Sequence, residues 1–203
     1  MFAFTSRRLA ALVAFPLLAA AKPVSGTPVD GKPHVIDKAH SEINFVADSR
    51  LLSAHGFFGK WDADVKLDAA NWSNSTVAIT IDAASINTRV DMRDNHLKSA
   101  DFFDVAKFPT ITFKSTGIEK KGDGYLVHGD LTIRGVTKPV TLETEVSGPH
   151  KNPWGKSVVG LSASTTVNRK DFGVNFNAPL ETGGLLISEK VKIEIEIEVT
   201  EET

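Results

Sequence analysis

Apolar and polar residues alternate along most of the chain after His40. The clearest case is the C-terminal segment, where Val191, Ile193, Ile195, Ile197 and Val199 alternate with Lys192, Glu194, Glu196 and Glu198. A period of two places the branched apolar side chains on one face of a β-strand and the charged ones on the other. A shift of one residue would bury the glutamates, so the pattern fixes the register of this strand.

Seven further segments show the same alternation and complete a set of eight predicted strands. They cover residues 43–45, 61–67, 77–83, 111–113, 127–133, 140–146 and 159–167. Turns rich in glycine and proline are predicted at residues 122–124, 135–139 and 148–155. Short connections of this kind predict antiparallel hairpins rather than crossovers through helices.

The connection between the third and fourth predicted strands has a helical pattern instead. Residues 88–105 predict a helix, in which Thr88 to Asp91 fits a capping box and Ser99 is placed to cap a second short turn. Pro109 then returns the chain to extended structure. A second long link, residues 170–189, is rich in glycine and asparagine and predicts little regular structure.

These elements predict an all-β fold: an eight-stranded antiparallel barrel with a short helical insertion between strands three and four. An open sheet would leave two exposed edges, and pairing of the last strand with the first removes both. A barrel of this size is either filled by side chains or holds one small ligand. The inward positions carry many Val, Ala and Thr residues and few large aromatics, which favours a cavity, although a tapered, filled barrel would use the same residues.

The N-terminus has the pattern of a secretory signal peptide over residues 1–21. Arg7 and Arg8 precede an uncharged apolar run that ends in three alanines, which predicts export and cleavage after Ala21. That run is shorter than a membrane-spanning helix and contains Pro16. Residues 22–33 predict a flexible leader, which leaves residues 34–203 as one β-barrel domain.

Composition narrows the function further. The formal net charge of the 203 residues is -2, and lysines and glutamates alternate without a basic run, which excludes a typical nucleic-acid binder. The chain has no cysteine, so it forms no disulfide and has no thiolate. Its six histidines include no His-Glu-x-x-His pair, and His40, His55 and His96 are brought together only if the fold does so. No metal, cofactor or catalytic residue is predicted.

Five blocks of sequence resemble the YceI-like family in order and rough spacing, over nearly all of the mature chain. They are His40-Ser41 with Ile43 and Phe45; Ser85-Ile86 with Thr88; residues 93–99 with 101–104 and Phe108-Pro109; residues 129–140; and residues 168–173. The resemblance implies a lipocalin-like barrel, periplasmic or secreted and often dimeric, that holds a polyisoprenoid such as an isoprenoid quinone or isoprenyl phosphate. It also allows transient contact with a membrane. Asp48 departs from the histidine of many relatives.

A ligand tail would contact the inward apolar positions, because each buried CH₂ contributes about 0.8 kcal/mol. The candidates are Ile43, Phe45, Val65, Ile79, Ile81, Phe102, Phe113, Leu131, Ile133, Leu142, Leu161, Ile193 and Ile195. A head group would meet a few polar residues at the barrel mouth. Arg93 and His96 are the first candidates, followed by Arg134 and Arg169, although these arginines would equally serve in surface ion pairs or turns.

Three functions are consistent with the sequence. The first is a carrier or store for a polyisoprenoid lipid. The second is the same barrel loaded with another amphiphile, such as a fatty acid or an amide. The third is a small enzyme using the His96 region, where Ser99 and Asp94 are close in sequence but no Gly-x-Ser-x-Gly motif surrounds the serine. Binding without catalysis is the preferred interpretation, with Phe102 and Phe103 as an apolar plug under the helix.

Overall fold

The structure is a computed structural model, and it describes residues 32–49, 53–68, 70–178 and 187–201. The predicted signal peptide and residues 22–31 of the predicted leader lie outside the described residues. The last two leader residues, 32 and 33, already belong to the first strand. No helix among the described residues is both long and apolar enough to cross a membrane.

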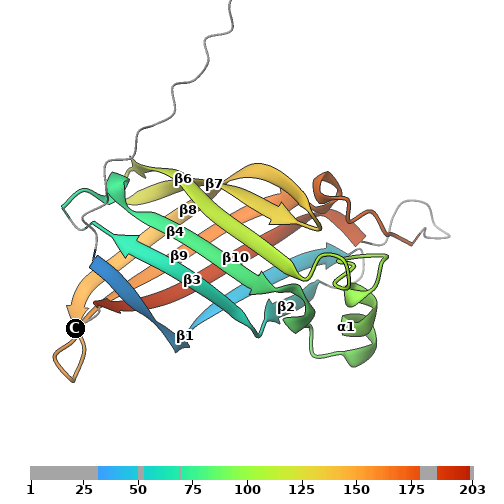
Figure 1. Cartoon of the computed structure of the whole chain (residues 1–203), viewed down its shortest axis with the longest axis horizontal. Helices are drawn as coiled ribbons and strands as arrows, with labels where there is room; N and C mark the ends of the chain where they lie inside the picture. The colour runs from blue at the N-terminus through green and yellow to red at the C-terminus, as the bar shows by residue number, and fades with distance from the viewer. Residues whose placement is uncertain (1–31, 50–52, 69, 179–186, 202–203) are drawn as a thin grey trace, which may run out of the picture.

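The described residues form one curled antiparallel sheet with a single α-helix at one end (Figure 1). The ten strands are β1 (Lys32–Ser49), β2 (Ala54–Phe58), β3 (Trp61–Leu67), β4 (Thr76–Asp82), β5 (Ile86–Asn87), β6 (Thr110–Lys121), β7 (Gly124–Ile133), β8 (Val136–Lys151), β9 (Ser157–Asn168) and β10 (Ile187–Glu201). The helices are η1 (Trp72–Asn74), η2 (Ala83–Ser85), α1 (Asp91–Lys98) and η3 (Arg169–Phe172). Neighbours in the sheet follow the order β10-β9-β8-β7-β6-β4-β3-β1-β2-β5.

The last strand pairs with the first, as barrel closure predicted. β1 and β10 run antiparallel from His34 opposite Glu201 to Ser49 opposite Ile187, with register shifts between. The start of β1 also pairs with the end of β3. The sheet therefore curls back on itself, and its inner face carries a continuous apolar core.

The prediction of eight strands is wrong, because the structure has ten among the described residues. Each of the eight predicted segments lies in a strand, except that Ala83 begins η2, and β2 and β5 are additional. β5 is only two residues long and β2 contains Gly56, so neither shows an alternation that sequence reasoning detects. Two predicted turns were also too long: residues 136–139 and 148–151 belong to β8, whose hairpin with β7 turns on Arg134 and Gly135 alone.

The helix is shorter than predicted, and Thr88 does not cap it. α1 covers only Asp91–Lys98, and its N-cap residue Val90 makes no side-chain capping bond. The buried carboxylate of Asp94 instead accepts hydrogen bonds from the backbone N–H and the hydroxyl of Thr88. Ser99 does hold a following turn, because its Oγ accepts the N–H of Asp101 at 3.3 Å.

Candidate ligand-binding cavity

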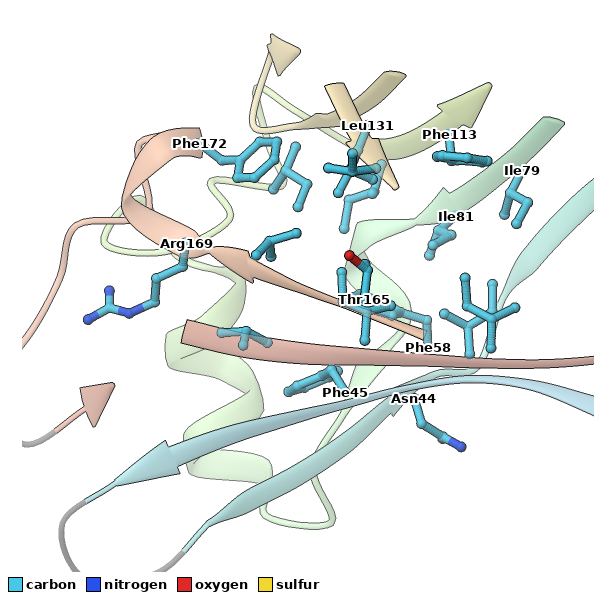
Figure 2. Close-up of a pocket in the computed structure, with 18 of the residues that line it drawn as sticks. Asn44, Phe45, Phe58, Ile79, Ile81, Phe113, Leu131, Thr165, Arg169 and Phe172 are labelled. Carbon is cyan, nitrogen blue, oxygen red and sulfur yellow. The ribbon is translucent and has the colours of Figure 1, made fainter. Parts of the chain in front are cut away.

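The inner face of the curled sheet surrounds a cavity with a volume of about 140 Å³. Figure 2 shows apolar side chains from facing strands of the curled sheet converging on it, whereas Asn44 and Arg169 point away. Almost all of the lining side chains are apolar; the polar ones are Asn44, Thr112, Thr165 and Arg169. The cavity therefore offers an apolar guest apolar surroundings, with few groups that would need hydrogen-bond partners.

Most of the predicted tail-binding residues lie in this lining. They are Ile43, Phe45, Ile79, Ile81, Phe113, Leu131, Ile133, Leu142, Ile193 and Ile195. Three others do not line it: Val65 is buried in the core at 1% exposure, Phe102 packs beside α1, and Leu161 is half-buried on β9. The alternation places a side chain on the inner face but does not give its depth along the barrel.

The lining contains more aromatic residues than the sequence led us to expect. Five phenylalanines contribute, namely Phe45, Phe58, Phe103, Phe113 and Phe172. Two rings take their places because a glycine on the neighbouring strand leaves room for them. A Cβ at Gly56 would lie 2.3 Å from the Phe45 ring, and one at Gly129 would lie 2.4 Å from the Phe113 ring. These glycines allow the rings to lie close against the backbone of the adjacent strand.

Several lining residues come from outside the alternating strands. Leu97 belongs to α1, Phe103 to the turns that follow it, and Phe172 and Val174 to η3 and the segment after it. The helix and η3 thus supply part of one end of the cavity. A period-two pattern gives no signal for these positions, although the predicted plug of Phe102 and Phe103 pointed to the correct segment.

The first head-group candidates, Arg93 and His96, do not line the cavity. Arg93 donates from Nε to the Thr88 hydroxyl at 2.7 Å and from Nη2 to the Thr88 carbonyl at 2.9 Å. His96 bonds through Nε2 to Asp101 at 2.8 Å, and its ring packs edge-on against Phe102 and Phe176. Both residues therefore hold the helix and its following turn in place.

The remaining polar candidates have different positions. Arg134 donates to the carbonyls of Gly173 at 2.7 Å and Ala100 at 2.8 Å, so it ties the turn after α1 to the end of η3. Asp48 accepts a hydrogen bond from Ser53 at 2.7 Å. Neither residue lines the cavity.

Arg169 is the one arginine in the cavity lining, and it is only 6% exposed. Its Nε donates to the carbonyl of Ser188, and its Nη1 donates to those of Val174 and Phe176, at 2.7–2.9 Å. Its Nη2 is buried without a hydrogen-bond partner among the described residues. Burial lowers the pKa of Arg169 and the charge of Glu189 opposes this, but a guanidinium keeps its proton at neutral pH. Figure 2 places Arg169 at one end of the cavity, with its guanidinium directed away from the apolar side chains.

The Ser99 region has the geometry of a helix end. The Ser99 hydroxyl donates to the carbonyl of His96 at 2.7 Å, and the imidazole is engaged by Asp101. A serine nucleophile needs its base within hydrogen-bond reach of the hydroxyl. These contacts give Ser99 a structural role instead.

A model of the YceI-like domain matches residues 34–199 of the chain. The chain belongs to the YceI-like family. A curated UPF0312 protein of Staphylococcus aureus strain RF122 is 40% identical over 164 residues, which cover 80% of this chain and 94% of that protein. This match confirms the resemblance carried by the five sequence blocks.

Solved structures show the same fold. Burkholderia cenocepacia BcnA has a TM-score of 0.71 and 26% identity, and the match covers 81% of this chain and 99% of that one. A Campylobacter jejuni YceI protein has a TM-score of 0.65 and 31% identity, with 74% and 86% covered. A polyisoprenoid-binding domain from Saccharophagus degradans has a TM-score of 0.57 and 15% identity, with 85% and 99% covered, and supports the fold alone.

Proposed function

We propose that this YceI-like protein binds one long-chain polyisoprenoid lipid, of the quinone or prenyl phosphate type, and carries or stores it without chemical change. The observation that carries the proposal is the almost wholly apolar lining of the inner cavity. The void of about 140 Å³ holds only a group of roughly benzene size, so a long prenyl tail has to displace lining side chains as it enters. Each CH₂ withdrawn from water contributes about 0.8 kcal/mol to that entry. The family membership supports the same class of ligand.

The head group of that lipid belongs at the Arg169 end of the cavity. Arg169 combines a stem in the lining with a guanidinium nitrogen that has no partner among the described residues. A buried donor without an acceptor costs free energy, and an oxygen of a quinone or a phosphate would remove that cost. This assignment replaces Arg93 and His96, whose polar atoms are engaged in holding the helix.

The test is native mass spectrometry of the purified protein, followed by organic extraction and identification of the released lipid. A matched pair of variants places the lipid in the cavity. Val191 lines the cavity, whereas its neighbour Lys192 points outward on the same strand. We expect Val191→Trp to lose the bound lipid and Lys192→Trp to keep it. Equal retention by both variants would place the ligand elsewhere.

The same extraction distinguishes the alternatives. A fatty acid or amide in place of a prenyl lipid would keep the binding function and change its ligand. An enzyme using the His96 region would lose activity on His96→Ala while still retaining the lipid. Loss of lipid uptake and of any phenotype together in that variant would leave no reason to assign catalysis.

Export to the periplasm, a homodimer and transient membrane contact are part of the same proposal. The signal-peptide pattern of residues 1–21 supports export, and N-terminal sequencing of the mature protein tests it. Beside the α1 end, Met92 is 82% exposed and Val90 is 43% exposed, which suits insertion into a lipid surface. Flotation with liposomes and light scattering test membrane contact and the dimer.

A further inference from the structure

A bulge in β1 brings three metal-ligating side chains together on the outer surface, away from the lipid cavity. Asp37 lies opposite Glu198 of β10, whereas the next paired residue, Glu42, lies opposite Glu196. β1 therefore holds three more residues than β10 over this stretch, and it turns His40 back toward Asp37. Bulges of this kind re-aim side chains and often accompany functional sites.

The bulge is fixed on both sides. The Ser41 hydroxyl accepts the backbone N–H of Glu198 at 2.9 Å, which ties the bulge to β10. Lys38 donates to the Trp61 carbonyl at 2.7 Å and lies 3.5 Å over the Trp61 ring, which ties it to β3. These anchors hold His40 over the β1–β10 pairing with little freedom to lose on binding a ligand.

The donor atoms already have a spacing close to that of a metal site. One ligand atom each from Asp37, His40 and Glu198 all lie within 4.8 Å of one another. His40 Nδ1 and Asp37 Oδ2 are 2.9 Å apart, and the other oxygen of Asp37 is oriented by the N–H of Ala39 at 2.9 Å. In a tetrahedral zinc site with bonds of about 2.0–2.1 Å, ligand atoms lie about 3.3 Å apart. Side-chain adjustments on the order of 1 Å would therefore complete three protein ligands.

The surrounding charges favour a cation. Asp37 faces Glu198 and Glu42 faces Glu196, so two successive positions of the β1–β10 pairing place acid opposite acid. Like charges directly opposite each other destabilise a sheet. Lys38, the nearest lysine in the bulge, is directed to Asp62 at 3.4 Å instead. A divalent ion would compensate this repulsion where the first and last strands meet.

We propose that Asp37, His40 and Glu198 bind one divalent transition-metal ion of the zinc class across the β1–β10 pairing. One imidazole nitrogen and two carboxylate oxygens suit Zn²⁺ with a water molecule as fourth ligand. Mg²⁺ requires six oxygen ligands in near-octahedral geometry and is a poor match. The bound ion links the two ends of the sheet and stabilises its closure.

The test is isothermal titration of the purified, tag-free protein with ZnCl₂, beside thermal unfolding with and without the ion. We expect one Zn²⁺ per chain and a rise in Tm that MgCl₂ does not reproduce. His40→Gln and Glu198→Gln should each lower zinc affinity by at least about tenfold. The matched control is His128→Gln, because His128 is a half-buried histidine 3.4 Å from one carboxylate, Glu119, and lies outside the three-residue group.

Two further results keep the proposal open to refutation. Each variant must unfold in a single cooperative transition without zinc, as the wild type does, so that lost binding is not lost folding. If a variant does not fold, X-ray absorption of the zinc-loaded wild-type protein decides, with one nitrogen and two carboxylate oxygens expected. Absence of saturable zinc binding, unchanged affinity in folded His40→Gln, or a nitrogen-rich coordination shell would each overturn the site.

Discussion

The ring of Phe113 lies against the backbone of Gly129 on the neighbouring strand, so closely that a Cβ there would approach two ring atoms to 2.4 Å and the Lys114 carbonyl oxygen to 2.6 Å. Phe113 also lines the apolar cavity. The glycine thus sets the position of a cavity wall without lining the cavity itself.

Gly129→Ala is expected to push the Phe113 ring from its place and to destabilise the protein by about 1–3 kcal/mol, as overpacking does. Gly117→Ala is the control, because a Cβ at Gly117 meets nothing within 4 Å. Gly117→Ala should leave the stability of the protein unchanged or raise it by up to about 1 kcal/mol, because alanine reduces the conformational entropy of the unfolded chain. Urea unfolding of both variants measures the difference, and equal stabilities would contradict this account of the ring.

Arg134 is expected to hold the α1 end of the cavity through the hydrogen bonds of its side chain to two carbonyls, and not through its left-handed backbone conformation. Its φ of 50° lies in the left-handed region, which asparagine tolerates well. Arg134→Asn should therefore preserve the turn and still cost about 1–3 kcal/mol by freeing the carbonyls of Ala100 and Gly173. Hydrogen exchange should quicken at residues 97–103.

Arg89→Asn provides the comparison for that variant. Arg89 is exposed and has a similar φ of 64°. The substitution should change stability by less than about 0.5 kcal/mol, as is usual for surface positions. A cost equal to that of Arg134→Asn would mean that the turn conformation, and not the carbonyl contacts, is the sensitive feature.

Thr88 and Asp94 are expected to act as one unit. Both are buried, at 4% and 6% exposure, and the Asp94 carboxylate accepts two hydrogen bonds from Thr88. Thr88→Val and Asp94→Asn should each destabilise the protein by about 1–3 kcal/mol. The double variant should cost less than their sum, with a coupling of about 0.5–3 kcal/mol in a double-mutant cycle. Additive losses would show that the two side chains contribute separately.

Asp68 predicts a pH dependence of stability. Hydrogen bonds from Asn74, and then from the N–H groups of Asn71 and Ala70, lower the pKa of Asp68 below its ordinary value. A lowered folded-state pKa gives stability that is present above the unfolded-state pKa of about 4 and lost as the pH falls through the folded-state value. Asp68→Asn should therefore be less stable than wild type at pH 7, and the gap should close in acid. A gap independent of pH would rule out the charge as its source.

The sequence predicted those parts of the fold that follow from a local period. The alternation in β10 fixed which face is buried, and Ile195, Ile197 and Val199 are indeed at most 8% exposed. β2 and β5 were not predicted, because their own residues show no alternation. They are strands because β2 pairs with β1 and β5 pairs with β2. Elements of this kind depend on tertiary contacts that no local window contains.

The cavity was predicted better at its walls than at its polar end. Inward positions such as Ile79 and Leu131 follow from the alternation, whereas Leu97 and Phe172 enter the lining from helical turns. The sequence favours Arg93 and His96 because they lie on a recognisable motif. The fold around the helix places Thr88 beside Arg93 and Asp101 beside His96. The burial of Arg169 likewise depends on the fold and has no local sequence signal.

The pairing of β1 with β10 has a consequence for biosynthesis. The hydrogen bond from Glu198 to Ser41 joins residues 157 positions apart, so the ribosome must release nearly the whole polypeptide before the sheet has its final partner. Contacts of such long sequence separation form late and slowly. Until then the N-terminal strand keeps an open edge, which exposes the chain to self-association whenever the C-terminus is cut short.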